Sequence, residues 1–292
     1  MTTKDQAPLF NTVGIIGVGL IGGSLGLAMK KAGLVKEVLG TGRTKSNLDI
    51  ALQHGLIDHI VDLPELAKQS DLIIICAPVA QTKDILQGLV AELKTSALII
   101  DVGSTKMDVV QSAKEALGEK IHQFIPCHPI AGGASHGANA ARVDLFENKQ
   151  VILCPLLENR VIDIDLIENT WKTIGAKVYK MAAVEHDHLF AAVSHLPHLL
   201  SYALMLQIAN ADDAQKKFVH AGAGFRDFTR IAGSSPEMWT DISLANRVAI
   251  LKELEGYLQI IEHMKKAIVE EDAKALQKMF QIASDSRNQW QG

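Results

Sequence analysis

Short apolar runs alternate with amphipathic stretches as far as residue 181 of the chain. Seven of these runs predict strands, at residues 12–16, 37–40, 71–76, 97–102, 121–126, 150–154 and 177–181. The runs DLIIIC at 71–76 and ALIIDV at 97–102 are uninterrupted, which is typical of strands buried on both faces. Amphipathic stretches predict helices between the strands, at residues 22–31, 45–54 and 79–93. Strands separated by helices predict an α/β fold with a doubly wound parallel sheet.

The pattern changes after residue 182, where the strand-like runs stop. Beyond it the apolar side chains have helical spacing, which predicts helices at residues 184–211, 214–220, 235–266 and 272–289. A length of 292 residues favours two domains, each with its own core. We therefore expect one domain over residues 1–182 that contains the sheet, an all-helical domain over residues 183–292, and a cleft between them.

A glycine-rich segment, VGIIGVGLIGGSLG at residues 13–26, joins the first predicted strand to the first predicted helix. Gly17, Gly19 and Gly22 have the G-x-G-x-x-G spacing of dinucleotide-binding Rossmann domains. In such a segment the first glycine permits the tight turn, the second lets the backbone approach a pyrophosphate, and the third lets helix and strand pack closely. With Leu20 and Ile21 between them, these glycines are the predicted cofactor-binding segment of a Rossmann domain. A purely structural glycine turn is the alternative.

The end of the second predicted strand indicates which dinucleotide binds. Domains that bind NAD usually have an Asp or Glu about 20 residues after the glycines, which accepts a hydrogen bond from the ribose 2′-hydroxyl. Here Gly42 occupies that place, and Arg43 and Thr44 follow it. Because a guanidinium forms charge-assisted bonds to a 2′-phosphate, we predict that Arg43 and Thr44 bind the cofactor and that NADP is preferred to NAD. A solvated surface arginine is the alternative.

Two polar segments directly follow predicted strands, and such positions lie at the sheet edge where α/β proteins bind ligands. The first, DVGSTK at residues 101–106, offers Ser104 as a partner for substrate or nicotinamide; capping of the next helix is the alternative. The second, CHPIAGG at residues 127–133, holds His128 beside a proline, where a neutral imidazole can accept a proton from a hydroxyl. We predict that Ser104 and His128 are catalytic; a structural role is the alternative for His128.

Residues 185–198, EHDHLFAAVSHLPH, place several histidines on the first predicted helix of the second domain. His195 and His198 are three residues apart, so they share one face of that helix. With His188 they offer three ligands for zinc, which is the alternative to substrate binding. Pro197 is expected to kink the helix and to free a carbonyl group. We assign His195 and His198 to substrate binding and assign no residue to a metal.

Arg230 follows a glycine-rich segment at residues 222–229 and has apolar neighbours in the sequence. An unpaired buried charge is costly, so we expect a carboxylate partner, either on the substrate or on Asp227 or Asp241. We assign Arg230 to substrate binding. Trp239 is expected either to contact a ring-shaped substrate or to fill the core.

Composition and charge exclude several classes of protein. A net charge of −4 and a pI of about 6.3 provide no basic surface, so we expect no nucleic-acid or membrane partner. We expect no apolar stretch of membrane-spanning length. The N-terminal segment MTTKDQAPLFN contains an acid and no apolar core, unlike a secretory signal. Three widely spaced cysteines indicate no disulfide framework, and we expect a cytoplasmic protein.

These segments, in this order, resemble those of the prephenate/arogenate dehydrogenase family. The matching segments are GIIGVGLIGGSLG, DVGSTK, CHPIAG followed by LFENKQVILCP, HDHLFAAVSHLPH and GAGFRDFTRIAGSSPEMWTDI. The resemblance implies oxidative decarboxylation of a cyclohexadiene with hydride transfer to NAD or NADP. The product would be 4-hydroxyphenylpyruvate from prephenate, or tyrosine from arogenate, in tyrosine biosynthesis. The sequence leaves the two substrates open, because they differ only in a keto or an ammonium group.

The resemblance also implies a role for each candidate residue. His128 would bind the ring hydroxyl and take its proton, and Ser104 would support both groups. Arg230 would bind a substrate carboxylate, and His198 would position the substrate side chain or the carboxylate.

The chain departs from the family pattern at residues 133–136 (GASH), where many members carry an acidic residue after HPIAG. No gating or inhibitor sensitivity is therefore inferred from that position. Because the chain ends near the last predicted helix, we expect no regulatory module or fused mutase, and feedback control by tyrosine would act at the active site. The apolar helices after residue 235 exceed what one small domain can bury, so we expect a homodimer.

Other functions stay open at this point. Another two-domain dehydrogenase, such as a β-hydroxyacid dehydrogenase or an imine reductase, would explain the dinucleotide segment and the helical half, but not the HPIAG and HLPH segments. A nicotinamide-sensing regulator or scaffold would share the fold. Metal-dependent hydrolysis would use the histidine cluster.

Overall fold

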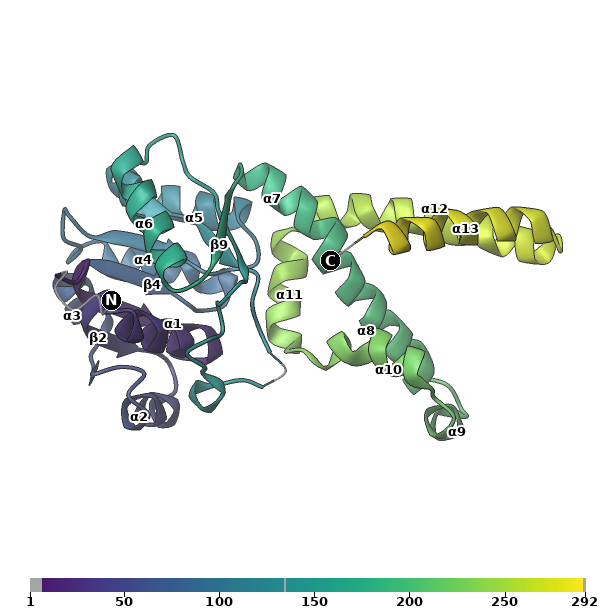
Figure 1. Cartoon of the computed structure of the whole chain (residues 1–292), viewed down its shortest axis with the longest axis horizontal. Coiled ribbons are helices and arrows are strands. Elements are labelled where there is room, and N and C mark those ends of the chain that lie inside the picture. Colours follow the sequence, from purple (N-terminus) through teal and green to yellow (C-terminus); the bar gives the residue numbers. More distant parts are fainter. Residues whose placement is uncertain (1–6, 134, 291–292) are drawn as a thin grey trace, which may run out of the picture.

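The computed structural model describes residues 7–133 and 135–290, so residues 1–6 and Ala134, on which two of the sequence arguments rest, lie outside the described residues. A six-stranded sheet in the order β3-β2-β1-β4-β5-β6 forms the centre of the N-terminal half (Figure 1). Its strands are β1 (Phe10–Ile16), β2 (Val35–Thr41), β3 (His59–Ile60), β4 (Leu72–Ile75), β5 (Leu98–Asp101) and β6 (Phe124–Ile125). Every neighbouring pair is parallel. This is the strand order of the Rossmann fold, and the predicted fold class is confirmed.

Helices cover both faces of this sheet. They are α1 (Leu20–Lys31), α2 (Lys45–Gln53), α3 (Leu63–Gln69), α4 (Thr82–Leu89), α5 (Met107–Leu117) and α6 (Val161–Thr173). On β4, Leu72 and Ile74 belong to one core cluster, whereas Ile73 and Ile75 belong to a second. The uninterrupted apolar run of this strand is therefore needed because both of its faces are buried.

A second, three-stranded sheet follows the sixth strand and contains β7 (Cys127–Pro129), β8 (Gln150–Leu153) and β9 (Lys177–Lys180). The sequence analysis placed the last two of these strands in the parallel sheet, and that placement is wrong. Strand β7 continues from β6 with only Pro126 between them, and β8 pairs with β7 in the antiparallel direction. His128 lies in this sheet opposite Ile152, with Cys127 and Pro129 as its neighbours along the strand.

The C-terminal half is helical, as predicted. It contains α7 (Ala183–Phe190), α8 (Leu196–Ala209), α9 (Ala214–Val219), α10 (Ala223–Thr229), α11 (Pro236–Ala245), α12 (Arg247–Val269) and α13 (Ala273–Gln289). Figure 1 shows two arms that project from the Rossmann half: α12 pairs with α13 in one, and α8 carries α9 and α10 in the other. Helix α11 lies between these arms and the sheet.

The long helix from Ala183 to Ala209 contains a π-helical turn, Ala191–His195, which joins α7 to α8. Pro197 follows this turn and has no backbone N–H to donate to the carbonyl of Val193, four residues earlier. The expected disturbance at Pro197 thus takes the form of one wider turn, a feature that is frequent at functional sites.

The single helix predicted over residues 235–266 is instead two helices, α11 and α12, separated by Asn246. The backbone of Asn246 leaves the helical region, with φ −102° and ψ 29°. Its buried side chain donates a hydrogen bond to the carbonyl oxygen of Asp187 at 2.7 Å, in a helix distant in sequence. A tertiary contact therefore interrupts an otherwise continuous helical pattern.

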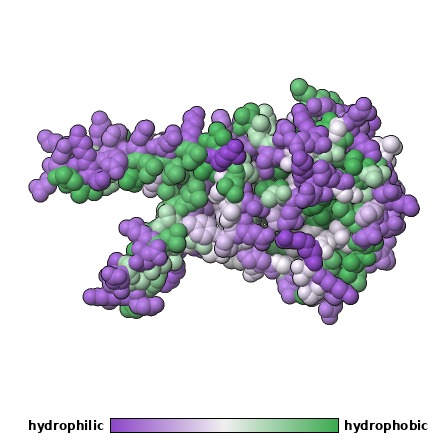
Figure 2. All heavy atoms as spheres, turned by 180° about the vertical axis from the view of Figure 1, so that it is seen from behind, coloured by the Kyte–Doolittle hydropathy of each residue, from purple (hydrophilic) through white to green (hydrophobic). Residues whose placement is uncertain are grey.

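The helix Ala183–Ala209 corrects the expectation that no apolar stretch reaches membrane-spanning length. It has 27 residues and a mean hydropathy of 1.5 over its most apolar window, and only 22% of that window is buried in the chain. By length and composition alone it is able to cross a bilayer. Figure 2 shows further hydrophobic side chains along both arms. The exposed ones include Leu206, Leu251, Leu258, Phe280 and Ile282.

An ion pair that is fully enclosed by protein lies at the carboxyl end of β5. Lys106 Nζ is 2.5 Å from Asp101 Oδ2, and the Lys106 side chain is 0% exposed. The same carboxylate accepts hydrogen bonds from the backbone N–H of Gly103 at 2.8 Å and of Cys127 at 3.1 Å. Asp101 therefore joins the end of β5 to the start of β7, next to His128.

Replacement of Lys106 by Met is expected to lower the free energy of unfolding by about 3–5 kcal/mol, because the substitution leaves the Asp101 carboxylate buried without its counter-charge. Urea denaturation measures this loss. Lys83→Met is the matched control, since it breaks the exposed Lys83–Glu115 pair at 2.6 Å and should cost far less than the loss of the buried pair. Equal losses in the two variants would contradict the structural role of the buried pair.

Candidate active site

A cleft of about 580 Å³ opens at the carboxyl ends of β1, β2 and β4. Of the predicted cofactor residues, Gly17, Gly19, Arg43 and Thr44 line it. Leu20 and Ile21 do not; their side chains pack against the core beneath α1. Gly22 does not line the cleft either, so the structure brings four of the seven predicted residues to one cleft and gives the other three supporting positions.

The three glycines of the fingerprint have distinct local environments. Gly17 has φ +91°, and a Cβ added to it would lie 2.7 Å from the carbonyl oxygen of Cys76. A Cβ on Gly22 would lie 2.5 Å from the carbonyl oxygen of Gly17. A Cβ on Gly19 would meet no atom within 4 Å, so its backbone faces open space. The tight turn thus needs Gly17 and the close packing needs Gly22, whereas Gly19 leaves room at the N-terminus of α1 for a pyrophosphate.

His128 is the first member of a chain of buried hydrogen bonds. His128 Nδ1 is 2.8 Å from His186 Nε2, and His186 Nδ1 is 2.8 Å from Asp187 Oδ1. The Asp187 carboxylate also accepts hydrogen bonds from the backbone N–H groups of Lys106 and Met107, each at 2.8 Å. These two amides begin helix α5, whose N-terminus favours a negative charge. A residue of the helical half is thus bonded to the Rossmann half.

The direction of these hydrogen bonds assigns the tautomer of His128. An ionised carboxylate only accepts, so His186 Nδ1 donates to Asp187. His186 Nε2 then accepts from His128 Nδ1–H, which leaves the lone pair on His128 Nε2. No hydrogen-bond partner of His128 Nε2 occurs among the described residues, so this nitrogen is available to a ligand.

The protonation states agree with this assignment. Burial lowers the pKa of His128 well below its usual value of 6.5, and the charge of Lys106 lowers it further. Burial opposes ionisation of Asp187, but hydrogen bonds from His186, Met107 and Lys106 hold its pKa below the usual 3.8. At neutral pH the chain therefore consists of two neutral imidazoles and one carboxylate.

Ser104 lies half-buried three residues beyond the end of β5. The helix that follows has no side-chain cap from its own segment, because Asp187 bonds its first amides instead. The helix-capping alternative for Ser104 is therefore wrong. Its hydroxyl makes no hydrogen bond within the described residues, which leaves it available at the sheet edge.

His195 is 1% exposed, and its Nδ1 lies 3.2 Å from the side-chain nitrogen of Asn246. Its Nε2 has no hydrogen-bond partner among the described residues. Burial lowers the pKa of His195 to about 4, against a smaller opposing effect of Asp187. The charge of His195 is also among the smaller causes that lower the pKa of His128.

His198 and Arg230 lie further along the helical half. The His198 ring stacks on Trp239, with ring centroids 3.7 Å apart, and its Nδ1 bonds the carbonyl oxygen of Ser194 at 2.9 Å. Burial lowers the pKa of His198, and the charge of Arg230 lowers it further. The positive charge of Arg230 thus disfavours protonation of His198, and both residues were assigned to substrate binding.

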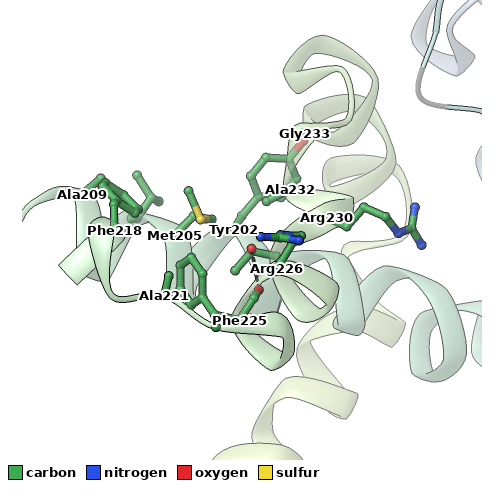
Figure 3. Close-up of a pocket in the computed structure, with 13 residues that line it drawn as sticks. Tyr202, Met205, Ala209, Phe218, Ala221, Phe225, Arg226, Arg230, Ala232 and Gly233 are labelled. Atoms are coloured by element: carbon green, nitrogen blue, oxygen red, sulfur yellow. Dashed lines mark hydrogen bonds between the residues drawn. The ribbon is translucent and has the colours of Figure 1, made fainter. Parts of the chain in front are cut away.

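Arg230 is exposed, which corrects the expectation that it is buried among apolar side chains. Neither Asp227 nor Asp241 forms an ion pair with it within the described residues. A second cavity of about 580 Å³ begins beside it and is lined by Tyr202, Met205, Phe218 and Phe225 (Figure 3). In this view the Arg230 side chain points away from the two phenylalanines, whereas Arg226 lies in the middle of the lining.

Metal binding finds no support in the described part of the chain, where no group of three or more His, Cys, Asp or Glu side chains is arranged to hold an ion. Of the three histidines considered for zinc, His188 is exposed and His195 is buried.

The sequence analysis missed His186, Asp187 and Asn246 as site residues. His186 and Asp187 stood in the segment that it singled out, but their partners are 58 and 81 residues away. The available signal was the run of four ionisable residues, Glu185 to His188, at the start of a helix that is mainly apolar beyond it.

The sheet order, the glycine turn and the histidine fixed at the sheet edge define a dinucleotide-dependent dehydrogenase with a helical C-terminal half. Two family models match the chain: "Prephenate dehydrogenase, nucleotide-binding domain" over residues 25–180 and "Prephenate dehydrogenase, dimerization domain" over residues 182–282. The chain therefore belongs to the prephenate dehydrogenase family. The family indicated by the sequence motifs, and with it a nicotinamide-dependent dehydrogenase of tyrosine biosynthesis, is confirmed.

Relatives of known function and structure agree with this membership. A prephenate dehydrogenase of Bacillus subtilis is 36% identical over 95% of this chain and 76% of its own length. A cyclohexadienyl dehydrogenase of Zymomonas mobilis is 30% identical over 96% of each chain. The crystal structure of prephenate dehydrogenase from Aquifex aeolicus, in complex with hydroxyphenyl propionate and NAD+, has a TM-score of 0.89 and 30% identity over 98% of this chain and 99% of its own.

Lowering the pH should destabilise the folded chain through its buried histidines. Folding lowers the pKa of His195 from 6.5 to about 4. Between these pH values His195 is therefore protonated in the unfolded chain and neutral in the folded chain. This stability is fully present above pH 6.5 and is lost as the pH falls towards 4, by about 3 kcal/mol. Urea denaturation between pH 7.5 and pH 4 measures the slope. His195→Asn should flatten it and the exposed-site control His220→Asn should not; an unchanged slope in His195→Asn would refute this origin.

Proposed function

We propose that this protein oxidises and decarboxylates prephenate or arogenate, with His128 as the base. The observation that carries the proposal is the His128–His186–Asp187 chain, which presents an unprotonated Nε2 at the sheet edge. The bond between Asp101 and the amide of Cys127 places this imidazole beside the carboxyl end of β5, one strand from the edge of the glycine cleft.

The protein's contribution to the reaction is to orient the substrate and to move one proton. When bound, the nicotinamide supplies the hydride acceptor. His128 Nε2 takes the proton of the ring hydroxyl as the carbon that bears it loses hydride. The electron pair of the C–CO₂ bond then enters the ring as CO₂ leaves, and the ring oxygen regains the proton from His128 as the phenol forms. While His128 holds this proton it carries a positive charge, which the Asp187 carboxylate stabilises through His186.

The remaining candidate residues are assigned to binding. Arg230, exposed and without an ion-pair partner in the described residues, binds a substrate carboxylate. His195 contributes an Nε2 without a hydrogen-bond partner in the described residues, and Ser104 contributes its hydroxyl. His198, whose ring stacks on Trp239, is assigned to the same substrate site. An ion pair with the carboxylate that leaves as CO₂ stabilises the bound substrate more than the transition state. Arg230 therefore lowers KM and does not raise kcat.

The proposed cofactor preference is NADP over NAD. In support, Arg43 and Thr44 line the cleft, and the end of β2 at Thr41 and Gly42 carries no carboxylate. A guanidinium at this place matches a 2′-phosphate.

The proposed assembly is a homodimer in which a second copy covers the helical half. The helix Ala183–Ala209 exposes most of its apolar window, and the two arms carry further exposed apolar side chains. Surfaces of this kind mark contacts between subunits, and the matching family model is described as a dimerization domain. We also propose a domain boundary between residues 182 and 183, and a cytoplasmic location, in line with three cysteines that are free in the structure.

Initial rates with prephenate and with arogenate, each with NAD and with NADP, test the function directly. One of the two cyclohexadienes should be oxidised with release of CO₂, and more efficiently with NADP. A simple β-hydroxyacid in the same panel tests the competing dehydrogenase class. Turnover of the hydroxyacid alone would overturn the proposal.

Two substitutions separate rate from binding. His128→Asn should lower kcat by about 10²-fold or more with a small change in KM, because it removes the base. Arg230→Ala should raise KM by roughly tenfold to hundredfold with little change in kcat, because a charge-assisted contact to the carboxylate is lost. Steady-state kinetics check both, and the reverse pattern would remove the assigned roles.

A further inference from the structure

An ion pair joins the two halves of the chain beside the cofactor cleft. Arg43 Nη2 lies 3.6 Å from Glu237 Oε1. Arg43 follows β2 and lines the cleft, whereas Glu237 lies in the first turn of α11, in the helical half. Both side chains are largely exposed, at 68% and 65%.

The carboxylate of Glu237 lies near the end of β2, where Rossmann domains that bind NAD usually have an Asp or Glu. The strand β2 ends at Thr41, and Gly42 follows it, so the end of the strand carries no acid of its own. Helix α11 packs against the short helical turn Val79–Gln81, and Gln81 lines the same cleft as Arg43. The acid therefore reaches the cofactor end of the cleft from the other half of the molecule.

We propose that Glu237 sets the discrimination between NADP and NAD by competing with the 2′-phosphate for Arg43. In the cofactor-free protein the Glu237 carboxylate is paired with the guanidinium of Arg43. NADP has to exchange this carboxylate for its phosphate, whereas NAD, with a neutral 2′-hydroxyl, leaves the pair intact. Glu237 thus weakens NADP binding and leaves NAD binding nearly unchanged.

The physical chemistry of the pair supports this exchange. An exposed ion pair is weak, and a phosphate offers more oxygens and more charge to a guanidinium than a carboxylate does. After the exchange the displaced carboxylate faces a like charge, which opposes NADP binding further. Substitution of Glu237 by Gln removes both the competition and the repulsion while the side chain keeps its size.

Helix α11, which carries Glu237, is also anchored near its start and just after its end. Trp239, two residues on, stacks on His198, and Asn246, just after α11, bonds Asp187 and His195. The helix backbone therefore has little freedom to carry the carboxylate away from the cleft when NADP arrives. The inference rests on the nicotinamide dependence of the family and not on the proposed preference for NADP.

Equilibrium binding of NADP+ and of NAD+ to the full-length protein, measured by titration calorimetry without substrate, tests the proposal. Glu237→Gln should lower the Kd of NADP+ by about threefold to fivefold and change the Kd of NAD+ by less than about twofold. Glu255→Gln removes the same charge from an exposed site on α12 and is the matched control, which should change neither Kd. Thermal unfolding of each variant verifies the fold.

A double-mutant cycle with Arg43→Ala completes the test. If Glu237 acts mainly through Arg43, Glu237→Gln should have a clearly smaller effect on NADP+ binding in the Arg43→Ala background, where only the repulsion between the carboxylate and the phosphate remains. Equal shifts for both cofactors, no shift for NADP+, or a shift of undiminished size without Arg43 would each overturn the proposal. A wild-type protein that prefers NAD+ would refute the proposed cofactor preference and leave this inference standing if the cycle behaves as expected.

Discussion

The position of the Asp187 carboxylate is the constraint on which the rest of the site depends. It lies in the first helix of the helical half, yet it accepts hydrogen bonds from two amides that begin α5 in the Rossmann half. The same carboxylate orients His186, and through it His128. Without this contact the tautomer of His128 would be undetermined, and the position of α7 relative to the sheet would rest on the His128–His186 hydrogen bond and on packing.

Several features could be predicted from the sequence because their causes are local. A strand, a tight turn and a closely packed helix need glycine at Gly17 and Gly22, and the structure shows the near-contacts that exclude a side chain there. The apolar runs of β4 and β5 identified strands because both faces of the sheet are covered. The change of pattern after residue 182 likewise marked the start of the helical half.

The features that could not be predicted depend on partners far away in the sequence. Asn246 ends a helix because its amide bonds Asp187, 59 residues earlier, and no local pattern distinguishes it from a surface asparagine. The strand β7 was not recognised because its three residues contain a proline and pair in the antiparallel direction with a distant segment. Arg230 was expected to be buried because its sequence neighbours are apolar, but its helix is part of an arm whose surface is exposed.

The two interruptions in the helical half, the π turn before Pro197 and the break at Asn246, meet through the contact between His195 and Asn246. Helices change direction at such irregular turns, so the directions of the two arms are set at this level. Asp187 precedes the π turn and is tied to the sheet. Asn246 also bonds the backbone of Asp187, so the arm that carries His198 and Arg230 and the imidazole of His128 are aligned from one common point.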